Sequence, residues 1–249
     1  MAFHDHFSSL AGTYAVYRPV YPDALFELLA RHAPATDAAW DAGCGSGQAS
    51  VGLAAHFARV EATDPSAAQV AEATPHPRVH YGVAPAERSG LPPHGVDLVL
   101  AAEAAHWFDV PAFEAEVRRV ARPGGLLAIV GYRLLEVDAA VDAAVGWYAY
   151  ERVGPWWPPE RALLDAGYAT LPVTLPEERP EPVTMTAAWS LHHLLGYLGT
   201  WSSTKRCREA TGIDPIPEAA DRLAAAWGAE ADTVRTVRWP LLQRWFRVP

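Results

Sequence analysis

The sequence of 249 residues has very little cysteine and lysine, and each shortage excludes a class of protein. Its two cysteines, Cys44 and Cys207, are too few for a disulfide framework or a cysteine zinc site. Lys205 is the one lysine among 20 basic residues, the formal net charge is −9, and the arginines form no basic stripe. We therefore expect no nucleic-acid partner.

Long apolar runs and a targeting leader are also missing. No segment reaches the roughly 18 consecutive apolar residues that a membrane helix needs. The N-terminus, Met1–His6, has no basic stretch followed by an apolar run. Half of the residues are hydrophobic and a fifth are charged, which is typical of a folded globular protein. These features predict a cytoplasmic protein with no membrane partner.

Short apolar runs alternate with helical patterns through the first half of the chain. The apolar runs predict strands at 38–40, 59–63, 79–83, 96–100 and 126–130, the last after a turn at 122–125. The remaining segments predict helices at 22–32, 48–58, 66–73 and 110–120. This alternation predicts an α/β fold in which helices cover both faces of a parallel sheet. Because such sheets bind ligands at the carboxyl ends of their strands, we expect the residues after those ends to converge on one crevice: Asp41, Asp64, 84–87 and 102–106.

The second half of the chain is different, because it holds eight of the ten tryptophans and many of the prolines. It predicts a helical insertion with loops at 138–175, a strand at 183–186, helices at 189–200 and 217–227, and a strand-like segment at 233–248 that Pro240 interrupts. We interpret this half as a lid or cap grown into a single domain.

A glycine loop, Gly43-x-Gly45-x-Gly47, follows the first predicted strand and opens a helix. A dinucleotide-binding fingerprint, G-x-G-x-x-G, would need a third glycine at position 48, where this chain has Gln48. A P-loop would need a lysine after the glycines, and none follows here. The carboxylate of Asp41 would repel a pyrophosphate and attract a cationic ammonium or sulfonium ligand. The loop therefore argues against a nicotinamide-dependent oxidoreductase.

Asp64 ends the second predicted strand, 21 residues after Gly43. A carboxylate at this position can accept hydrogen bonds from both hydroxyls of a ribose. The alternative is a turn initiator, since Pro65 follows directly.

The segment Asp41-Ala-Gly-Cys-Gly-Ser-Gly-Gln48, with Asp64 and with Asp97 inside the fourth strand, resembles the signature of the class I S-adenosylmethionine-dependent methyltransferases. The segments 14–22, 106–109 and 197–202 further resemble the branch that contains the trans-aconitate methyltransferases, which act on small molecules, often at carboxylates. The resemblance implies one domain over 1–249 with a Rossmann-like, doubly wound, mostly parallel sheet of seven strands. Its cofactor-binding core would span 1–135, a substrate cap about 138–230, and the final strands 231–249.

The resemblance also implies which residues bind S-adenosylmethionine. The methionine part would be lined by Asp41, Gly43, Gly45 and Gln48, and the ribose would be held by Asp64. The adenine would be flanked by Pro65, Ala86 and Glu87. The residues nearest the reacting methyl would be Ala102, Glu103 and His106. Two residues of the N-terminal segment, Tyr14 and Arg18, would close over the cofactor.

His106 is the candidate catalytic base, because it follows a strand end and its imidazole titrates near neutral pH. The sulfonium is an activated methyl donor, so the protein has to align the acceptor and exclude water. An ionised carboxylate needs no base, whereas a phenol or an ammonium group would. The alternative is that His106 positions Trp107 or caps the helix that begins near Asp109.

Aromatic side chains suit the wall of an acceptor pocket. The candidates, each of which could instead pack the cap, are Trp107, Trp156, Trp157, Trp189 and Trp201. Candidate partners for an acidic acceptor, or else solvated surface residues, are Arg133, Arg152, Arg161 and Arg206. We expect no metal site, because adjacent histidines such as His192 and His193 point in different directions on a helix.

The sequence thus predicts a monomeric or homodimeric enzyme that methylates a small molecule, by O-methylation and at a carboxylate. Two alternatives stay open. One is N- or C-methylation of a heterocyclic or isoprenoid-like metabolite, and the other is a non-catalytic regulator that binds S-adenosylmethionine.

Overall fold

A mostly parallel sheet forms the centre of the protein, whose computed structural model describes residues 17–228 and 232–249. Within these residues the sheet has eight strands in the order β3-β2-β1-β4-β5-β8-β6, and β7 pairs with β8. The parallel strands are β1 (Ala38–Ala42), β2 (Arg59–Asp64), β3 (Val79–Val83), β4 (Val96–Ala102) and β5 (Ala121–Tyr132). The antiparallel strands are β6 (Glu177–Glu178), β7 (Thr184–Trp189) and β8 (Arg235–Arg247).

Helices cover both faces of the sheet, as the alternating pattern predicted. Along β1, Ala39 belongs to one buried cluster and Trp40 to the other, because successive side chains of a strand point to opposite faces. The first cluster includes residues of α2 (Asp23–His32) and α3 (Gln48–Leu53), and the second includes residues of α5 (Val110–Val120). The short α4 (Ala67–Ala71) follows β2. The structure therefore confirms the doubly wound α/β class.

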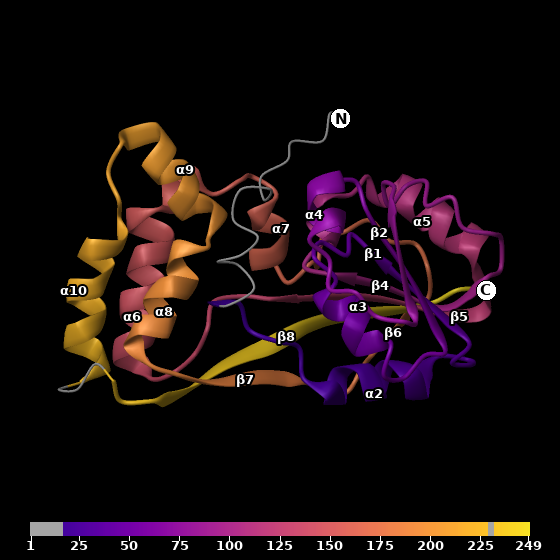
Figure 1. The fold of residues 1–249 in the computed structure, drawn as a ribbon, viewed down its shortest axis with the longest axis horizontal. Coiled ribbons are helices and arrows are strands. Elements are labelled where there is room, and N and C mark those ends of the chain that lie inside the picture. The colour runs from indigo at the N-terminus through magenta and orange to yellow at the C-terminus, as the bar shows by residue number, and fades with distance from the viewer. Residues whose placement is uncertain (1–16, 229–231) are drawn as a thin grey trace.

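The second half of the chain contributes most of a group of helices beyond one end of the sheet (Figure 1). This group consists of α6 (Ala139–Trp147), α8 (Leu191–Gly199), α9 (Ser202–Thr211) and α10 (Ile216–Trp227). The short π-helix η2 (Tyr148–Arg152) and the 3₁₀ helix η3 (Gly154–Trp156) lead from α6 to α7 (Arg161–Asp165), which lies between the group and the first half. We refer to residues 138–228 as the cap.

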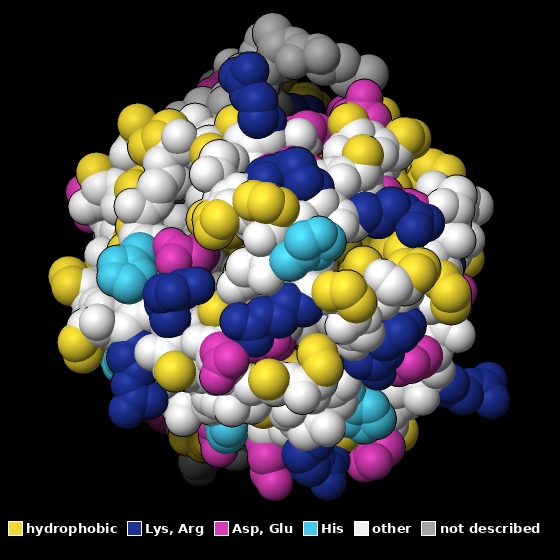
Figure 2. Space-filling model, turned by 90° about the vertical axis from the view of Figure 1, so that its right-hand side faces the viewer, with side chains coloured by type: hydrophobic (Ala, Val, Ile, Leu, Met, Phe, Trp, Pro, Cys, Tyr) yellow, Lys and Arg dark blue, Asp and Glu magenta, His cyan; other side chains and the backbone are white. Residues whose placement is uncertain are grey.

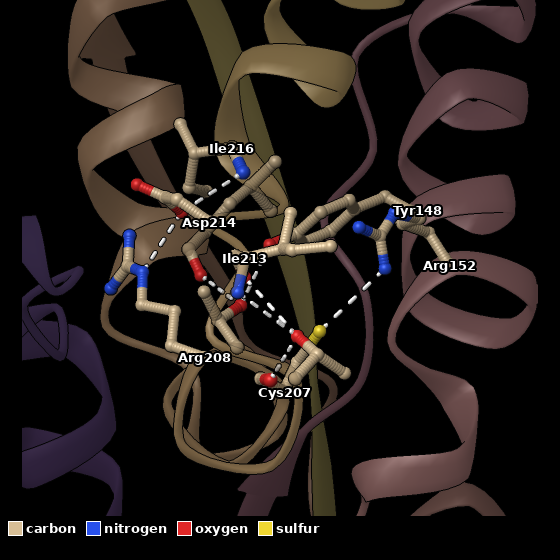
Figure 3. A network of polar contacts seen from close by, with 10 residues as sticks. Tyr148, Arg152, Cys207, Arg208, Ile213, Asp214 and Ile216 are labelled. Atoms are coloured by element: carbon tan, nitrogen blue, oxygen red, sulfur yellow. Dashed lines mark hydrogen bonds and ion pairs between the residues drawn. The ribbon is translucent and has the colours of Figure 1, made fainter.

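A polar network joins the elements of the cap (Figure 3). The guanidinium of Arg152 donates to Sγ of the buried Cys207 over 3.6 Å and pairs with Glu218 of α10. Arg208 donates to Asp214 over 2.8 Å, and the same carboxylate accepts the backbone N–H of Ile216 at the start of α10. These contacts hold η2, α9 and α10 together.

The sheet has eight strands rather than the seven expected. The additional strand is β6, which pairs with β8. Its Glu177 forms an ion pair with Arg244 of β8, and its Glu178 forms one with Arg247. The expected interruption at Pro240 is also wrong, because β8 runs through this residue. Proline has no N–H to donate, and Pro240 stands where β8 changes partner from β7 to β5.

Several element boundaries differ from the expectation. The helix expected over 48–58 ends at Leu53, and the one expected over 66–73 spans Ala67–Ala71 with Ser66 as its N-cap. The turn at 122–125 is an irregularity inside β5, and Trp189 ends β7 instead of opening a helix. Helix α9 was not expected, because its polar sequence shows no apolar periodicity.

An ion pair joins the starts of three core strands. The buried Asp97 of β4 accepts the backbone N–H groups of Asp37 and Ala38 and pairs with Arg122 over 2.7 Å, so it joins the starts of β1, β4 and β5.

The surface of the protein carries side chains of mixed character. Figure 2 shows basic side chains scattered among acidic and hydrophobic ones on the face it presents. Within residues 17–228 and 232–249, no helix has the length and apolar character to cross a membrane.

Candidate active site

The glycine loop between β1 and α3 has the backbone conformation that its glycines permit. Gly43, Gly45 and Gly47 have φ values of 74°, 54° and 84°, in the left-handed region that residues with a Cβ avoid. A Cβ at Gly43 would lie 2.7 Å from Cβ of Ala104, and one at Gly47 would lie 2.2 Å from the Tyr81 hydroxyl. The glycines therefore let this loop pack against β3 and against the segment that follows β4.

Asp64 fixes the glycine loop to the end of β2. Its Oδ2 accepts the backbone N–H of Gly45 over 2.9 Å, and its Oδ1 accepts that of Ser66 over 2.8 Å. The bond to Ser66 closes the turn that the Asp64-Pro65 pair predicted. The bond to Gly45 joins Asp64 to a loop that is distant in the sequence. The carboxylate therefore lies at the carboxyl end of β2, beside the glycine loop.

Asp41 is 1% exposed, and its Oδ2 accepts a hydrogen bond of 2.6 Å from the Ser50 hydroxyl. Burial raises the pKa of this carboxyl to about 7, with the Ser50 bond opposing and the charge of Asp64 adding to the rise. Among the described residues, its Oδ1 is buried without a hydrogen-bond partner. A buried carboxylate oxygen of this kind suits a cationic ligand group, which would satisfy its hydrogen-bonding capacity and its charge.

The segment that precedes α2 closes onto both the glycine loop and the cap. Gln48 donates from Nε2 to the backbone carbonyl of Pro19 over 3.0 Å. Arg18 donates to the Tyr132 hydroxyl over 3.4 Å and to the Thr200 carbonyl over 3.3 Å. Its guanidinium lies 5.4 Å from the centre of the Tyr197 ring. Arg18 therefore joins the end of β5 to helix α8 of the cap.

A cavity lies where the carboxyl ends of β4 and β5 face the cap. The residues that line it from the core side are Glu103, His106, Trp107, Tyr132, Arg133 and Leu134. Those that line it from the cap are Trp157, Pro158, Arg161, Leu164, Tyr197, Trp201 and Ser202, and Arg18 reaches it from the N-terminal side. The space beside Gly43 where a Cβ would stand is taken by Ala104, so the glycine loop lies directly beside the segment that carries His106 into this cavity.

Glu103 follows β4 with a φ of 54°, an uncommon backbone conformation for a residue with a Cβ. Its Oε1 accepts the backbone N–H of Tyr132 over 2.6 Å. Burial raises the pKa of the Glu103 carboxyl to about 7, although the Tyr132 bond and the charges of Arg161 and Arg18 oppose this rise. Such backbone strain is typical of functional sites.

His106 lies in η1 (Ala105–Trp107) and lines the cavity. Its Nδ1 is 2.9 Å from the hydroxyl of Tyr168, and its ring centre lies 4.9 Å from that of Trp107. Burial lowers the pKa of the His106 imidazole to about 4, and the positive charge of Arg161 lowers it further. His106 is therefore neutral at neutral pH.

The structure brings some of the predicted cofactor residues into the cavity and leaves others beside it. Arg18 and Glu103 line the cavity with His106, whereas the glycine loop and Asp64 lie along the neighbouring strand ends. On the expected adenine side, Ala86 is buried in the core, Pro65 follows Asp64, and Glu87 accepts the backbone N–H of Asp109 before α5. Ala102 is the last residue of β4. Tyr14 lies outside the described residues.

The five candidate tryptophans divide into two groups. Trp107, Trp157 and Trp201 line the cavity, and the rings of Trp157 and Trp201 are 5.3 Å apart. Trp156 and Trp189 are not among the residues that line it, and Trp189 of β7 packs against Trp239 of β8.

The candidate arginines divide in the same way. Arg133 and Arg161 line the cavity, whereas Arg152 belongs to the network of Figure 3 and Arg206 is not among the lining residues. Tyr132 and Tyr168 were missed, because contacts between residues distant in the chain leave no local pattern in the sequence. Tyr197 begins the third segment of the resemblance and could have been singled out there.

Comparison with known proteins identifies the class that this fold and site define. The profile of the methyltransferase domain matches residues 40–129, which include the glycine loop, Asp64 and His106. A protein named as a methyltransferase from Dictyostelium discoideum is 34% identical over 229 residues, which cover 90% of this chain and 87% of that protein. A solved structure named as a type II methyltransferase from Anaeromyxobacter dehalogenans is 50% identical and superposes with a TM-score of 0.87 over 93% of this chain and 98% of that one.

A methyltransferase from an antibiotic biosynthesis pathway of Anabaena variabilis, at 18% identity, covers 89% of this chain and 98% of its own and has a TM-score of 0.55. It shows the same Rossmann-like fold. The fold is thus that of a methyltransferase. The chain belongs to the class I S-adenosylmethionine-dependent methyltransferases, and its cofactor is S-adenosylmethionine.

Proposed function

We propose that this enzyme transfers a methyl group to a carboxylate oxygen of a small-molecule acid bound in the cavity. The observation that carries the proposal is the charge of the lining. Arg18, Arg133 and Arg161 line the cavity, and the one acidic side chain among the described lining residues is Glu103. A cavity with this balance favours an anionic acceptor.

Two of these arginines are suited to hold the acceptor. Arg161 uses Nε to pair with Asp165 over 2.9 Å, and its guanidinium lies 4.6 Å from the centre of the Trp157 ring. This contact orients the group while its other donors remain available to a carboxylate, which arginine binds in a two-pronged manner. Arg133 follows β5, is exposed, and has no ion pair within residues 17–228 and 232–249.

The cofactor-binding residues fit S-adenosylmethionine. In the proposed arrangement Asp41 faces the cationic methionine end, Asp64 holds the ribose, and the glycine loop lets the cofactor approach the backbone closely. Arg18 lies where it can pair with the carboxylate of the methionine end. The cofactor supplies a methyl group that is already activated as a sulfonium.

The chemistry requires alignment and no base. A bond forms between the acceptor oxygen and the methyl carbon as the bond from sulfur to that carbon breaks, and the acceptor's negative charge and the sulfonium charge cancel. No proton has to leave a carboxylate at neutral pH, so the neutral His106 does not have to remove one. The resemblance to the trans-aconitate methyltransferase branch supports the same acceptor class.

The proposal can be tested with labelled S-adenosylmethionine and a library of small carboxylic acids, with products identified by mass and by their hydrolysis in mild base. We expect base-labile methyl esters. Replacing Arg161 with Gln should raise KM for the acid about 10-fold or more, since hydrogen bonds to charged groups contribute about 1.5–3 kcal/mol. Affinity for S-adenosylhomocysteine should not change.

The matched control is Arg152→Gln, which removes a cap arginine that does not line the cavity. It should leave KM for the acid unchanged. Base-stable products, which would be methyl ethers or N- or C-methylated compounds, would contradict the proposal. Cofactor binding without methyl transfer to any metabolite would contradict it too.

A further inference from the structure

Tyr168 lies against the catalytic cavity from a turn that follows α7. Its side chain is fully buried, and its backbone φ of 60° is in the left-handed region. The hydroxyl is 2.9 Å from Nδ1 of His106, and the two rings lie 6.0 Å apart and 20° from parallel. Tyr168 therefore fixes both the position and the plane of the imidazole.

The direction of the hydrogen bond follows from what each group has available. Within residues 17–228 and 232–249, the Tyr168 hydroxyl has one hydrogen-bond partner, the Nδ1 atom of His106. If the hydroxyl accepted a hydrogen from Nδ1, its own proton would be buried without an acceptor, which is unfavourable. The hydroxyl therefore donates and Nδ1 accepts. Burial raises the pKa of the Tyr168 hydroxyl, so the phenol keeps its proton.

A neutral imidazole carries one hydrogen, so an accepting Nδ1 places it on Nε2. The imidazole is neutral because burial and the charge of Arg161 lower its pKa. Among the described residues, Nε2 has no hydrogen-bond partner, and the ring lines the cavity. The charged groups that line the same cavity are Arg18, Glu103, Arg133 and Arg161.

We infer that Tyr168 is a positioning residue that holds His106 as the tautomer with hydrogen on Nε2, so that His106 offers the methyl acceptor a hydrogen-bond donor and not a base. The donor role rests on the proposed function, because a donor suits an acceptor that is already ionised. Arg161 and His106 would then present their donors to one carboxylate from the cap and from the core. The tautomer itself does not depend on the identity of the acceptor.

The tautomer can be measured directly by nitrogen NMR of the enzyme labelled at histidine, with the His106 signals assigned by their loss in His106→Gln. At neutral pH we expect His106 to show a protonated Nε2 and an unprotonated Nδ1. In Tyr168→Phe the pattern should change to a mixture of tautomers or to a protonated Nδ1. Tyr148→Phe is the matched control, since its buried hydroxyl bonds to Thr204, and it should leave the His106 signals unchanged.

The kinetic test uses the fact that glutamine keeps a donor and cannot act as a base. His106→Gln should retain kcat within about 10-fold of the wild type, whereas loss of a general base costs about 100-fold or more. His106→Leu, which loses the donor, should raise KM for the acid. Between pH 6 and 9 the pH profile of kcat should be the same in the wild type and His106→Gln, because the groups of the site with a pKa of about 7 are Asp41 and Glu103 and not His106.

The two proposals can fail separately. A wild-type signal with a protonated Nδ1, or a His106→Gln variant with kcat at least 100-fold lower, overturns the inference about His106 even if methyl esters are formed. The expected tautomer together with a non-carboxylate product supports the role of Tyr168 and overturns the proposed acceptor.

Discussion

The carboxylate of Glu103 accepts the backbone N–H of Tyr132 over 2.6 Å and thereby joins the segment after β4 to the end of β5. The residue before Tyr132 is Gly131, and its lack of a side chain makes this arrangement compatible with the cap. A Cβ at Gly131 would lie 2.8 Å from Leu164, 2.8 Å from the Tyr168 ring and 3.0 Å from Oε1 of Glu103.

Gly131→Ala is therefore expected to disturb both the site and the packing of the core. The added methyl must displace Tyr168 or Glu103, at a cost of about 1–3 kcal/mol for an overpacked core position. Because Tyr168 contacts His106, we expect kcat/KM for the acid to fall at least about 10-fold, the equivalent of 1.4 kcal/mol. Steady-state kinetics and chemical denaturation measure the two effects. Gly146→Ala in α6 is the control, since a Cβ there meets no atom within 4 Å. An active Gly131→Ala enzyme would contradict this view of the packing.

Asp41 makes the stability of the protein without ligand depend on pH. Burial raises its pKa from 3.8 to about 7, so between these values the folded state holds a proton that the unfolded state has lost. Stability from this group is present at low pH and is lost as pH rises through about 7. Asp41→Asn removes the ionisation, so we expect the variant to gain stability relative to the wild type as pH rises from 5 to 8. The gain should be about 2–3 kcal/mol, from about 1.4 kcal/mol per pH unit.

Denaturant unfolding of both proteins across this pH range provides the measurement. Glu103→Gln should change the profile with the same sign, because burial also raises the pKa of Glu103 to about 7. Parallel profiles for wild type and Asp41→Asn would show that Asp41 ionises normally in the folded protein.

Asp64→Asn is expected to weaken binding of S-adenosylhomocysteine about 10-fold to 100-fold, since hydrogen bonds to a charged group contribute about 1.5–3 kcal/mol. Part of the loss would come from the glycine loop, because Asp64 accepts the Gly45 N–H. Calorimetry gives the affinity, and thermal unfolding separates the effect on the loop. Glu61→Gln on the same strand is the control, and equal affinities of the two variants would exclude Asp64 as the ribose ligand.

Adjacent tryptophans allow a matched test of the cavity wall. Trp157 lines the cavity and stacks beneath Arg161, whereas its neighbour Trp156 does not line it. We expect Trp157→Leu to raise KM for the acceptor at least about 5-fold, from a loss of about 1 kcal/mol of ring contact and arginine orientation. Trp156→Leu should leave KM unchanged. Equal values of KM for the two variants would place the acceptor away from Trp157.

The core could be predicted because its signals are local. Alternating apolar strands and helices gave the sheet, and the spacing of Gly43, Gly45 and Gly47 gave a loop whose φ values are all positive. Asp64 was singled out by its position at a strand end, although its bond to the Gly45 N–H required the structure.

The cap could not be predicted to the same depth, because its contacts join distant parts of the chain. Tyr168 reaches His106 across 62 residues, and no periodic pattern marks a single tyrosine in a turn. Helix α9 lacked an apolar stripe, and it is held in part by the bonds of Cys207 and Arg208 to neighbouring elements. The tryptophans were visible in the sequence, but which of them line the cavity depends on how η1, the segment after η3 and the start of α9 come together.

The continuity of β8 limits how this enzyme can be engineered. Residues 235–240 pair with β7, next to the cap helices, and residues 241–247 pair with β5 in the core. The cap side and the core therefore share one strand, and neither can be excised as a module without leaving an exposed sheet edge in the other. At the proposed acceptor site, new specificity would have to be sought by exchanging individual side chains around Trp157 and Arg161, and not by grafting a foreign cap.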